Sequence, residues 1–220
     1  MSLATKSLQA RKSVLASPEY QLQLLSGASS PALPTFADQL AKSGLAPLRR
    51  TGLDILQVNV GKLCNQTCKH CHVDAGPDRR EVMTQTTMQH CLNALKNGPF
   101  TTLDITGGAP EMTPHFRWFV EQAVALGKHV MVRCNLTIIT ANPKYRDLPE
   151  FFKANRVEVI SSLPFYNSRK TDSQRGDGVF EKSIEALQLL NAVGYGQPGS
   201  GLLLHLVYNP TGAFLPHGDA

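Results

Sequence analysis

The sequence has no long apolar run, no secretory signal segment and no even set of cysteines, and each absence excludes a class of protein. No stretch approaches the roughly 18 apolar residues that a membrane-spanning helix requires, so we expect no membrane partner. The apolar core of a secretory signal is also missing. The five cysteines are odd in number and three are clustered, which argues against a secreted disulfide framework. We therefore expect a cytoplasmic protein.

The excess of positive charge is small outside the N-terminal segment. Of the net charge of +5, residues 1–50 supply most, because they hold six Lys or Arg residues against Glu19 and Asp38. No basic stripe with interleaved aromatic residues is present, so we expect no nucleic-acid partner. Residues 1–35 are rich in Ser, Ala, Leu and basic residues. They predict a flexible leader, with an organellar targeting segment as the alternative.

The remainder alternates between short apolar runs and amphipathic segments, which predicts strands alternating with helices. Such an alternation is typical of right-handed βαβ units and a parallel sheet. Periodicity alone leaves an open sheet and a curved partial barrel as alternatives. The expected strands are 55–60, 101–106, 129–133, 157–163 and 202–208. The expected helices are 36–43, 84–98, 113–127, 145–154 (interrupted by Pro149) and 180–194, the third opening with Pro114 in its first position.

The most informative stretch is Cys64-Asn-Gln-Thr-Cys68-Lys-His-Cys71, which directly follows the first expected strand. A structural zinc site normally has four ligands, usually in two separated pairs. Iron–sulfur clusters are the other common use of closely spaced thiolates. Three local ligands would leave one iron of a [4Fe–4S] cube open to a substrate or cofactor. We expect Cys64, Cys68 and Cys71 to be metal ligands, with structural zinc as the alternative.

This motif after a first strand resembles the radical S-adenosylmethionine (SAM) superfamily. Two neighbouring segments resemble one branch of it, the arsenosugar-biosynthesis proteins with a Cys-rich C-terminal domain. These segments are Cys71-His-Val-Asp-Ala-Gly-Pro77 and Thr106-Gly-Gly-Ala-Pro-Glu-Met112. The resemblance covers about residues 36–215 and implies a partial (βα)6 barrel in a core domain 36–220. It also implies a [4Fe–4S] cluster and SAM as cofactors. The expected partners are a small-molecule substrate and an external one-electron reductant of the flavodoxin or ferredoxin type.

The resemblance also implies which residues bind SAM. His70 stands where the family commonly has an aromatic residue beside the adenine. Gly107, Gly108 and Ala109 match a Gly-Gly-Glu segment that contacts the SAM amino group, although alanine replaces the glutamate and Glu111 follows two residues later. Polar residues at later strand ends complete the set: Asn135, Ser161 and Arg175. Without the resemblance, the stretch around Arg175 is typical of a solvated loop, and Cys134 of a buried, inert thiol.

The implied chemistry is reductive cleavage of SAM to methionine and a 5′-deoxyadenosyl radical, which in this branch adds to a trivalent methylated arsenical. The family continues with a sixth strand and a Cys-rich domain. Since the chain ends at Ala220, soon after the fifth strand, we expect a truncated barrel. Two alternatives stay open: a radical SAM enzyme acting on another substrate such as a peptide, and a non-catalytic cluster- or zinc-binding fragment.

Overall fold

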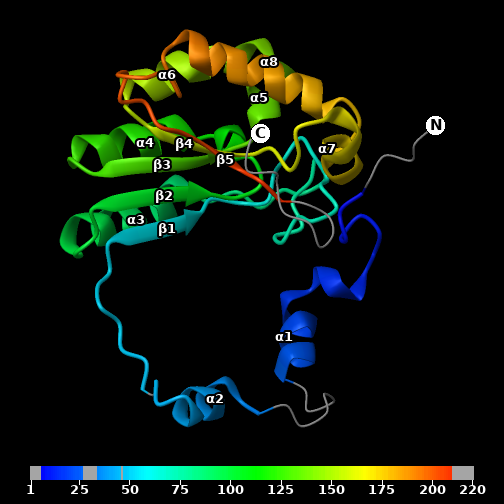
Figure 1. Cartoon of the computed structure of the whole chain (residues 1–220), viewed down its shortest axis with the longest axis vertical. Coiled ribbons are helices and arrows are strands. Elements are labelled where there is room, and N and C mark those ends of the chain that lie inside the picture. The colour runs from blue at the N-terminus through cyan, green and yellow to red at the C-terminus, as the bar shows by residue number, and fades with distance from the viewer. Residues whose placement is uncertain (1–5, 27–33, 46, 210–220) are drawn as a thin grey trace. The chain divides into compact units, whose positions relative to one another are not determined.

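The computed structural model describes residues 6–26, 34–45 and 47–209. Its centre is a five-stranded parallel sheet in the order β1-β2-β3-β4-β5 (Figure 1). The strands are β1 (Ile55–Asn59), β2 (Thr102–Thr106), β3 (His129–Cys134), β4 (Glu158–Ser162) and β5 (Leu204–Val207). Sequential order with right-handed crossovers places every connecting helix on the same face of the sheet. The result is a partial parallel barrel, as the family resemblance implies.

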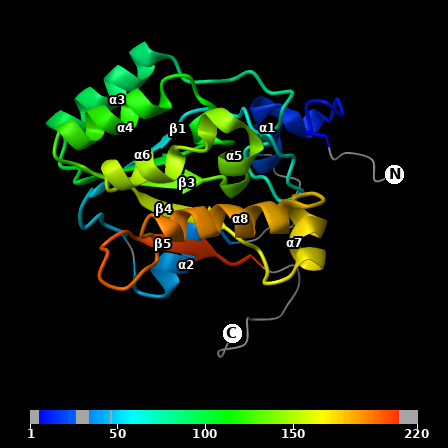
Figure 2. The ribbon, with the colours of Figure 1, turned by 90° about the horizontal axis from the view of Figure 1, so that it is seen from above.

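The connecting helices follow one another across that face, as Figure 2 shows from above. Alternate strand residues point toward them, and among these Leu103, Ile105, Val132 and Val159 are fully buried. Phe116, Phe119 and Phe152 complete this core from the helix side. The helices are α3 (Gln85–Asn97), α4 (Phe116–Ala125), α5 (Leu136–Ala141), α6 (Leu148–Ala154), α7 (Ser168–Arg175) and α8 (Val179–Ala192).

The chain packs as two compact units, divided between residues 7 and 8 and again between residues 53 and 54. The smaller unit, Leu8–Leu53, contains α1 (Pro18–Ser26) and α2 (Phe36–Lys42). The second of these is the short helix expected from the sequence, and it begins with a capping box between Thr35 and Asp38. Part of the expected leader, residues 1–5 and 27–33, lies outside the described residues. The domain limits 1–35 and 36–220 stay predictions.

All five expected strands form, but two helical expectations were wrong in detail. The third helix begins at Phe116 and not at Pro114, because Pro110–Met112 forms a 3-10 turn and Thr113 is extended. Pro149 does not interrupt the next helix, since it lies in the first turn of α6, where its missing N–H has no intrahelical acceptor. The last expected helix, 180–194, is α8 at Val179–Ala192, and it buries Val179, Ser183, Ala186 and Leu190.

Within the larger unit, helices α5 and α7 were not expected at all. Helix α5 has only six residues, too few for a periodic pattern, and its apolar side chains are buried. Helix α7 replaces the solvated loop that the polar stretch around Arg175 suggested. Asn167 caps its first turn by accepting a hydrogen bond from Lys170 N, and Gly176 follows its last residue. These capping residues at both ends decide the conformation of a segment that has no apolar stripe.

Between β1 and α3 the chain makes a long excursion, residues 60–83, that carries the cysteine motif. Its two ends are paired, since Lys62 N donates to Glu81 O at 2.8 Å and Met83 N donates to Val60 O at 2.8 Å. Inside it, Arg79 is almost completely buried. Its guanidinium donates to Asp74 Oδ2 at 2.6 Å and to both carboxylate oxygens of Glu81. Hydrogen bonding to Arg79 lowers the pKa of Glu81 to about 2.

We predict that Arg79→Met destabilises the protein by about 2 kcal/mol, because it leaves the half-buried Asp74 without its guanidinium partner. The wild-type stabilisation from Glu81 is present above the ordinary carboxyl pKa and is lost as the pH falls toward 2, so the variant should lose less stability over that range. Urea unfolding at pH 7 and pH 3.5 measures both effects. Equal pH dependence in the two proteins would contradict the assignment.

Candidate functional site

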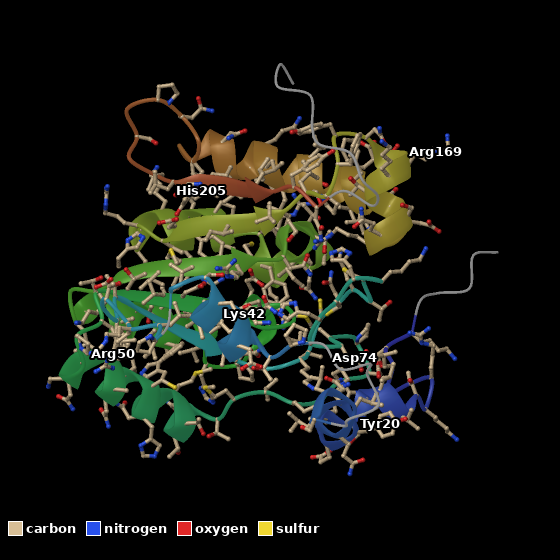
Figure 3. The ribbon with its side chains drawn as sticks, turned by 60° about the horizontal axis from the view of Figure 1, so that its bottom comes forward. Tyr20, Lys42, Arg50, Asp74, Arg169 and His205 are labelled. Atoms are coloured by element: carbon tan, nitrogen blue, oxygen red, sulfur yellow. The ribbon has the colours of Figure 1, made fainter. Side chains whose placement is uncertain are left out.

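A cavity of about 220 Å³ lies at the carboxyl-terminal ends of the strands. In Figure 3, Asp74 on the cysteine-bearing excursion and Arg169 on α7 mark this end of the molecule, and His205 marks β5. The cavity is lined by all three cysteines of the motif, by His70, Gly107, Gly108, Asn135 and Arg175 from the expected site, and by strand residues including Arg133, Ile160, Ser162 and Val207. Functional residues of parallel barrels collect at this end.

The three cysteines are held by backbone and side-chain contacts. Gln66 N donates to Cys64 Sγ at 3.4 Å and Ala75 N donates to Cys71 Sγ at 3.2 Å, which is how sulfur ligands are commonly stabilised. The Cys68 thiol lies 3.7 Å from Gln66 Oε1. Burial raises the pKa of Cys64 to about 12 and also raises that of Cys68. Metal binding therefore has to displace thiol protons.

Within the described ranges, no three His, Cys, Asp or Glu side chains converge on a point where a single metal ion would bind. The three thiols nonetheless line one cavity. In a four-iron cube each cysteine bonds a different iron, so the ligands surround the cluster and need not meet at one atom. The arrangement is compatible with such a cluster.

The Gly107-Gly108 pair packs directly against the start of the cysteine-bearing excursion. Gly108 N donates to Gly61 O, and Ala109 N donates to Leu63 O, each at 2.9 Å. A Cβ at Gly108 would lie 2.5 Å from Leu63 O, and one at Gly107 would lie 2.9 Å from Gly61 O. The glycines are thus required for two backbones to approach each other. An ammonium ligand only donates hydrogen bonds, so on this segment it would have to bind carbonyl oxygens.

Asn135 ties the end of β3 to the cysteine motif. Its side-chain nitrogen donates to Asn65 Oδ1 at 2.7 Å and lies 3.5 Å from Cys64 Sγ, while its backbone N–H donates to Glu111 Oε1 at 3.2 Å. The residue is buried and lines the cavity. Its side chain orients the first cysteine in this structure, and a direct contact with SAM stays a prediction.

Ser161 and Ala109 are placed differently from the other expected site residues. Both are buried, and neither is among the cavity-lining residues, whereas Ser162 is. The reason is the two-residue period of β4, which directs Ser161 toward the helices and Ser162 toward the cavity. A SAM contact through the Ser161 hydroxyl stays a prediction, and Ser162 is the serine that the strand presents to the cavity.

Glu111 is a carboxyl group enclosed behind the cavity wall. It is 5% exposed, and its Oε2 has no hydrogen-bond partner in the described part of the chain. Burial raises its pKa from the ordinary value of 4.5 to about 7, against the opposing effects of the Cys134 thiol and of backbone N–H donors. Burial also raises the pKa of Cys134 well above its ordinary value. Cys134 is 4% exposed, a buried thiol as the sequence suggested, and it is also among the residues that line the cavity.

His70 and Arg175 both line the cavity, one from the cysteine motif and one from the end of α7. Partial burial lowers the pKa of His70, and the nearby charge of Arg175 lowers it further. Arg175 Nη2 donates to Gln66 Oε1 at 3.1 Å, and Lys69 N donates to Gln174 O at 2.9 Å. These two bonds join α7 to the cysteine motif.

A layer of polar side chains on the cavity side of the sheet was missed by the sequence reasoning. Asp104 on β2 is 2% exposed and accepts hydrogen bonds from Gln57 Nε2 at 2.6 Å and Arg133 Nη2 at 2.9 Å. The register pairs Gln57 directly with Asp104. An aspartate within an otherwise apolar strand was the available signal, because a buried carboxylate requires a partner. The sequence reasoning also did not identify Gln66 as a site residue, although it lies between Cys64 and Cys68 in the motif.

The comparisons with known proteins agree with this geometry. The family model described as the radical SAM superfamily matches residues 58–211. The chain belongs to the radical SAM superfamily. Members of this superfamily use a [4Fe–4S] cluster and SAM.

Curated relatives include mycofactocin maturases. One from Mycobacterium ulcerans is 27% identical over 132 residues, which is 60% of this chain and 35% of the relative. One from Mycolicibacterium smegmatis is 29% identical over 133 residues, covering 60% of this chain and 33% of the relative. The chain thus spans about a third of the length of the curated relatives it matches.

Solved structures show the same fold at low sequence identity. The anSMEcpe structure with bound AdoMet has a TM-score of 0.54 at 16% identity and covers 71% of this chain and 43% of its own. Streptococcus suis SuiB bound to S-adenosylmethionine has a TM-score of 0.54 at 16% identity, with 80% and 42% covered. Streptococcus suis SuiB bound to precursor peptide SuiA gives 0.55 at 16% identity, with 71% and 34% covered.

The residues around the cavity suit the superfamily's cofactors. Three thiols line a common space, and two buried polar atoms of its lining residues have no hydrogen-bond partner among the described residues, namely Gln66 Nε2 and Arg175 Nε. Buried donors of this kind are normally satisfied by a ligand or by water. Along the described chain, no helix is long and apolar enough to cross a membrane.

We predict that Gly108→Ala destabilises the protein by about 2 kcal/mol and reduces cluster incorporation, because the new methyl group collides with Leu63 O. Gly127→Ala is the matched control. Gly127 has a φ of +71° and open space around it. Gly127→Ala should therefore lower the free energy of unfolding by about 1 kcal/mol, through backbone strain alone. Urea unfolding and the iron content after reconstitution measure the two effects. Normal iron content in Gly108→Ala would contradict the prediction.

We also predict that Glu111→Gln flattens the pH dependence of stability. The raised pKa means that the folded state holds a proton that the unfolded chain releases, so wild-type stability is complete below pH 4.5 and falls as the pH rises through 7. The loss is at most about 3 kcal/mol. Urea unfolding of reduced, cluster-free protein at pH 5 and pH 8 tests it. A wild-type protein that is more stable at pH 8 than at pH 5 would contradict the prediction that Glu111 is protonated in the folded state.

Proposed function

We propose that the protein is a radical SAM enzyme in which Cys64, Cys68 and Cys71 hold a [4Fe–4S] cluster and the adjoining cavity binds SAM. The observation that carries the proposal is that all three thiols line one cavity at the carboxyl ends of parallel strands. When bound, the reduced cluster supplies one electron to the SAM sulfonium, which yields methionine and a 5′-deoxyadenosyl radical. The protein's part is to position SAM and to exclude water.

The proposed roles of the other residues follow from their places around the cavity. The carbonyl groups of the Gly107–Gly108 segment accept hydrogen bonds from the SAM amino group. Arg175 approaches the carboxylate, and its position beside Gln66 puts its charge next to the cysteine motif. His70 lies beside the adenine. Asn135 holds the first cysteine in place through its side-chain nitrogen.

For the substrate, we propose a trivalent methylated arsenical, to whose arsenic the 5′-deoxyadenosyl radical adds; transfer of one electron from the adduct to an oxidised flavodoxin or ferredoxin would then leave pentavalent arsenic. The support is the resemblance of residues 71–77 and 106–112 to the arsenosugar branch. A peptide substrate is the second candidate, supported by the mycofactocin maturases among the relatives and by the SuiB structure with a precursor peptide. A flavodoxin or ferredoxin is the proposed electron donor, and the cytoplasm the proposed location.

We predict that anaerobically reconstituted protein, reduced with dithionite, converts SAM to 5′-deoxyadenosine. A variant with Cys64, Cys68 and Cys71 all changed to alanine should hold no cluster and form no product. Cys91→Ala is the control, since Cys91 lies on α3 and is not a cavity residue. Iron analysis, visible absorption and chromatography give the readouts. A folded wild type that takes up zinc and no cluster would sink the proposal.

The same assay distinguishes the two substrates. Adding trivalent dimethylarsenic should yield a product whose mass is that of a 5′-deoxyadenosyl–arsenic adduct, formed only with intact cysteines. Formation of 5′-deoxyadenosine without any adduct would remove the arsenical and leave the peptide as the candidate.

A further inference from the structure

Gln66 lies in the wall between two hollows of the molecule. One is the cavity lined by the three cysteines, and the other is a larger polar cleft of about 540 Å³ between the cysteine motif, α5 and α7. Gln66 and Arg175 line both. The two residues therefore separate the cavity from the outer cleft.

The side chain of Gln66 is buried, and only its oxygen has a hydrogen-bond partner among the described residues. The residue is 8% exposed, its Oε1 accepts a hydrogen bond from Arg175 Nη2 at 3.1 Å, and the Cys68 thiol lies 3.7 Å from the same oxygen. Its Nε2 has no hydrogen-bond partner within the described residues, and neither has Arg175 Nε. Two neighbouring buried donors without acceptors are costly unless a ligand supplies the acceptors.

The ligand that satisfies both donors must carry oxygen acceptors and is favoured by negative charge. A guanidinium N–H and an amide N–H, fixed to each other through Gln66 Oε1, together suit a carboxylate. SAM carries one carboxylate, and in the proposed function this group lies beside the cysteine motif, where Gln66 is placed between Cys64 and Cys68.

We propose that Gln66 binds the carboxylate of SAM together with Arg175. Gln66 Oε1 orients the guanidinium, and Gln66 Nε2 donates its own hydrogen bond to the same carboxylate. This inference rests on the proposed function, because it requires the cavity to bind SAM.

The test is SAM affinity, measured by anaerobic calorimetry on cluster-loaded protein, with the EPR change on SAM addition as a second readout. Gln66→Met keeps the volume and removes both polar atoms, so it should weaken binding about tenfold. Gln66→Glu keeps an acceptor for Arg175, but replaces the donor with a negative charge beside the carboxylate. It should therefore weaken binding more than Gln66→Met.

If Gln66 only held Arg175 in place, the opposite order would result, with Gln66→Glu close to wild type. The double variant Gln66→Met, Arg175→Met should lose less affinity than the product of the two single losses, because both residues bind the same group. Gln89→Met, an exposed position on α3, is the control and should bind like wild type. Urea unfolding shows that each variant is folded.

Wild-type affinity in Gln66→Met, or tighter binding by Gln66→Glu than by Gln66→Met, overturns the inference and leaves the proposed function intact. A cluster-loaded wild type that binds no SAM overturns the proposed function, and the inference with it.

Discussion

The close approach of two backbones, Gly107–Gly108 after β2 and Gly61–Leu63 after β1, is the constraint on which the site depends. At this contact a methyl group in place of a glycine hydrogen would lie 2.5 Å from a carbonyl oxygen. The contact fixes where the cysteine-bearing excursion leaves the sheet. From there the paired ends of the excursion and the buried Arg79 set the path of the chain to each thiol. The glycine motif is therefore architectural as well as being part of the cavity wall.

Much of the fold followed from the sequence because each strand is a short apolar run bounded by turn residues, and long amphipathic helices such as α3 have clear caps. The errors arose where tertiary contacts or capping decided the outcome. Helix α5 is too short to show a period, and α7 has capping residues but no apolar face. The buried face of α8 includes Ser183 and Ala186 beside Val179 and Leu190, and spacing alone does not identify such small or polar residues as core.

The site residues that belong to local sequence motifs could be predicted from the sequence. Three closely spaced thiols after a strand indicate a cluster, and the structure brings them to one cavity with Gly107, Gly108, His70, Asn135 and Arg175. Gln66, Arg133 and Ser162 could not be found this way. Their relevance comes from strand register and from contacts across 109 positions in the chain, as between Gln66 and Arg175.

Hydrogen bonds within the polypeptide hold the excursion between β1 and α3. Lys62, Cys64 and Gly76 are paired through their backbones, and the sulfurs of Cys64 and Cys71 already accept bonds from backbone N–H groups. The conformational entropy of ordering the three thiols is thus lost during folding of the polypeptide. A cluster held by thiols ordered in this way would leave little further entropy to be lost when it binds.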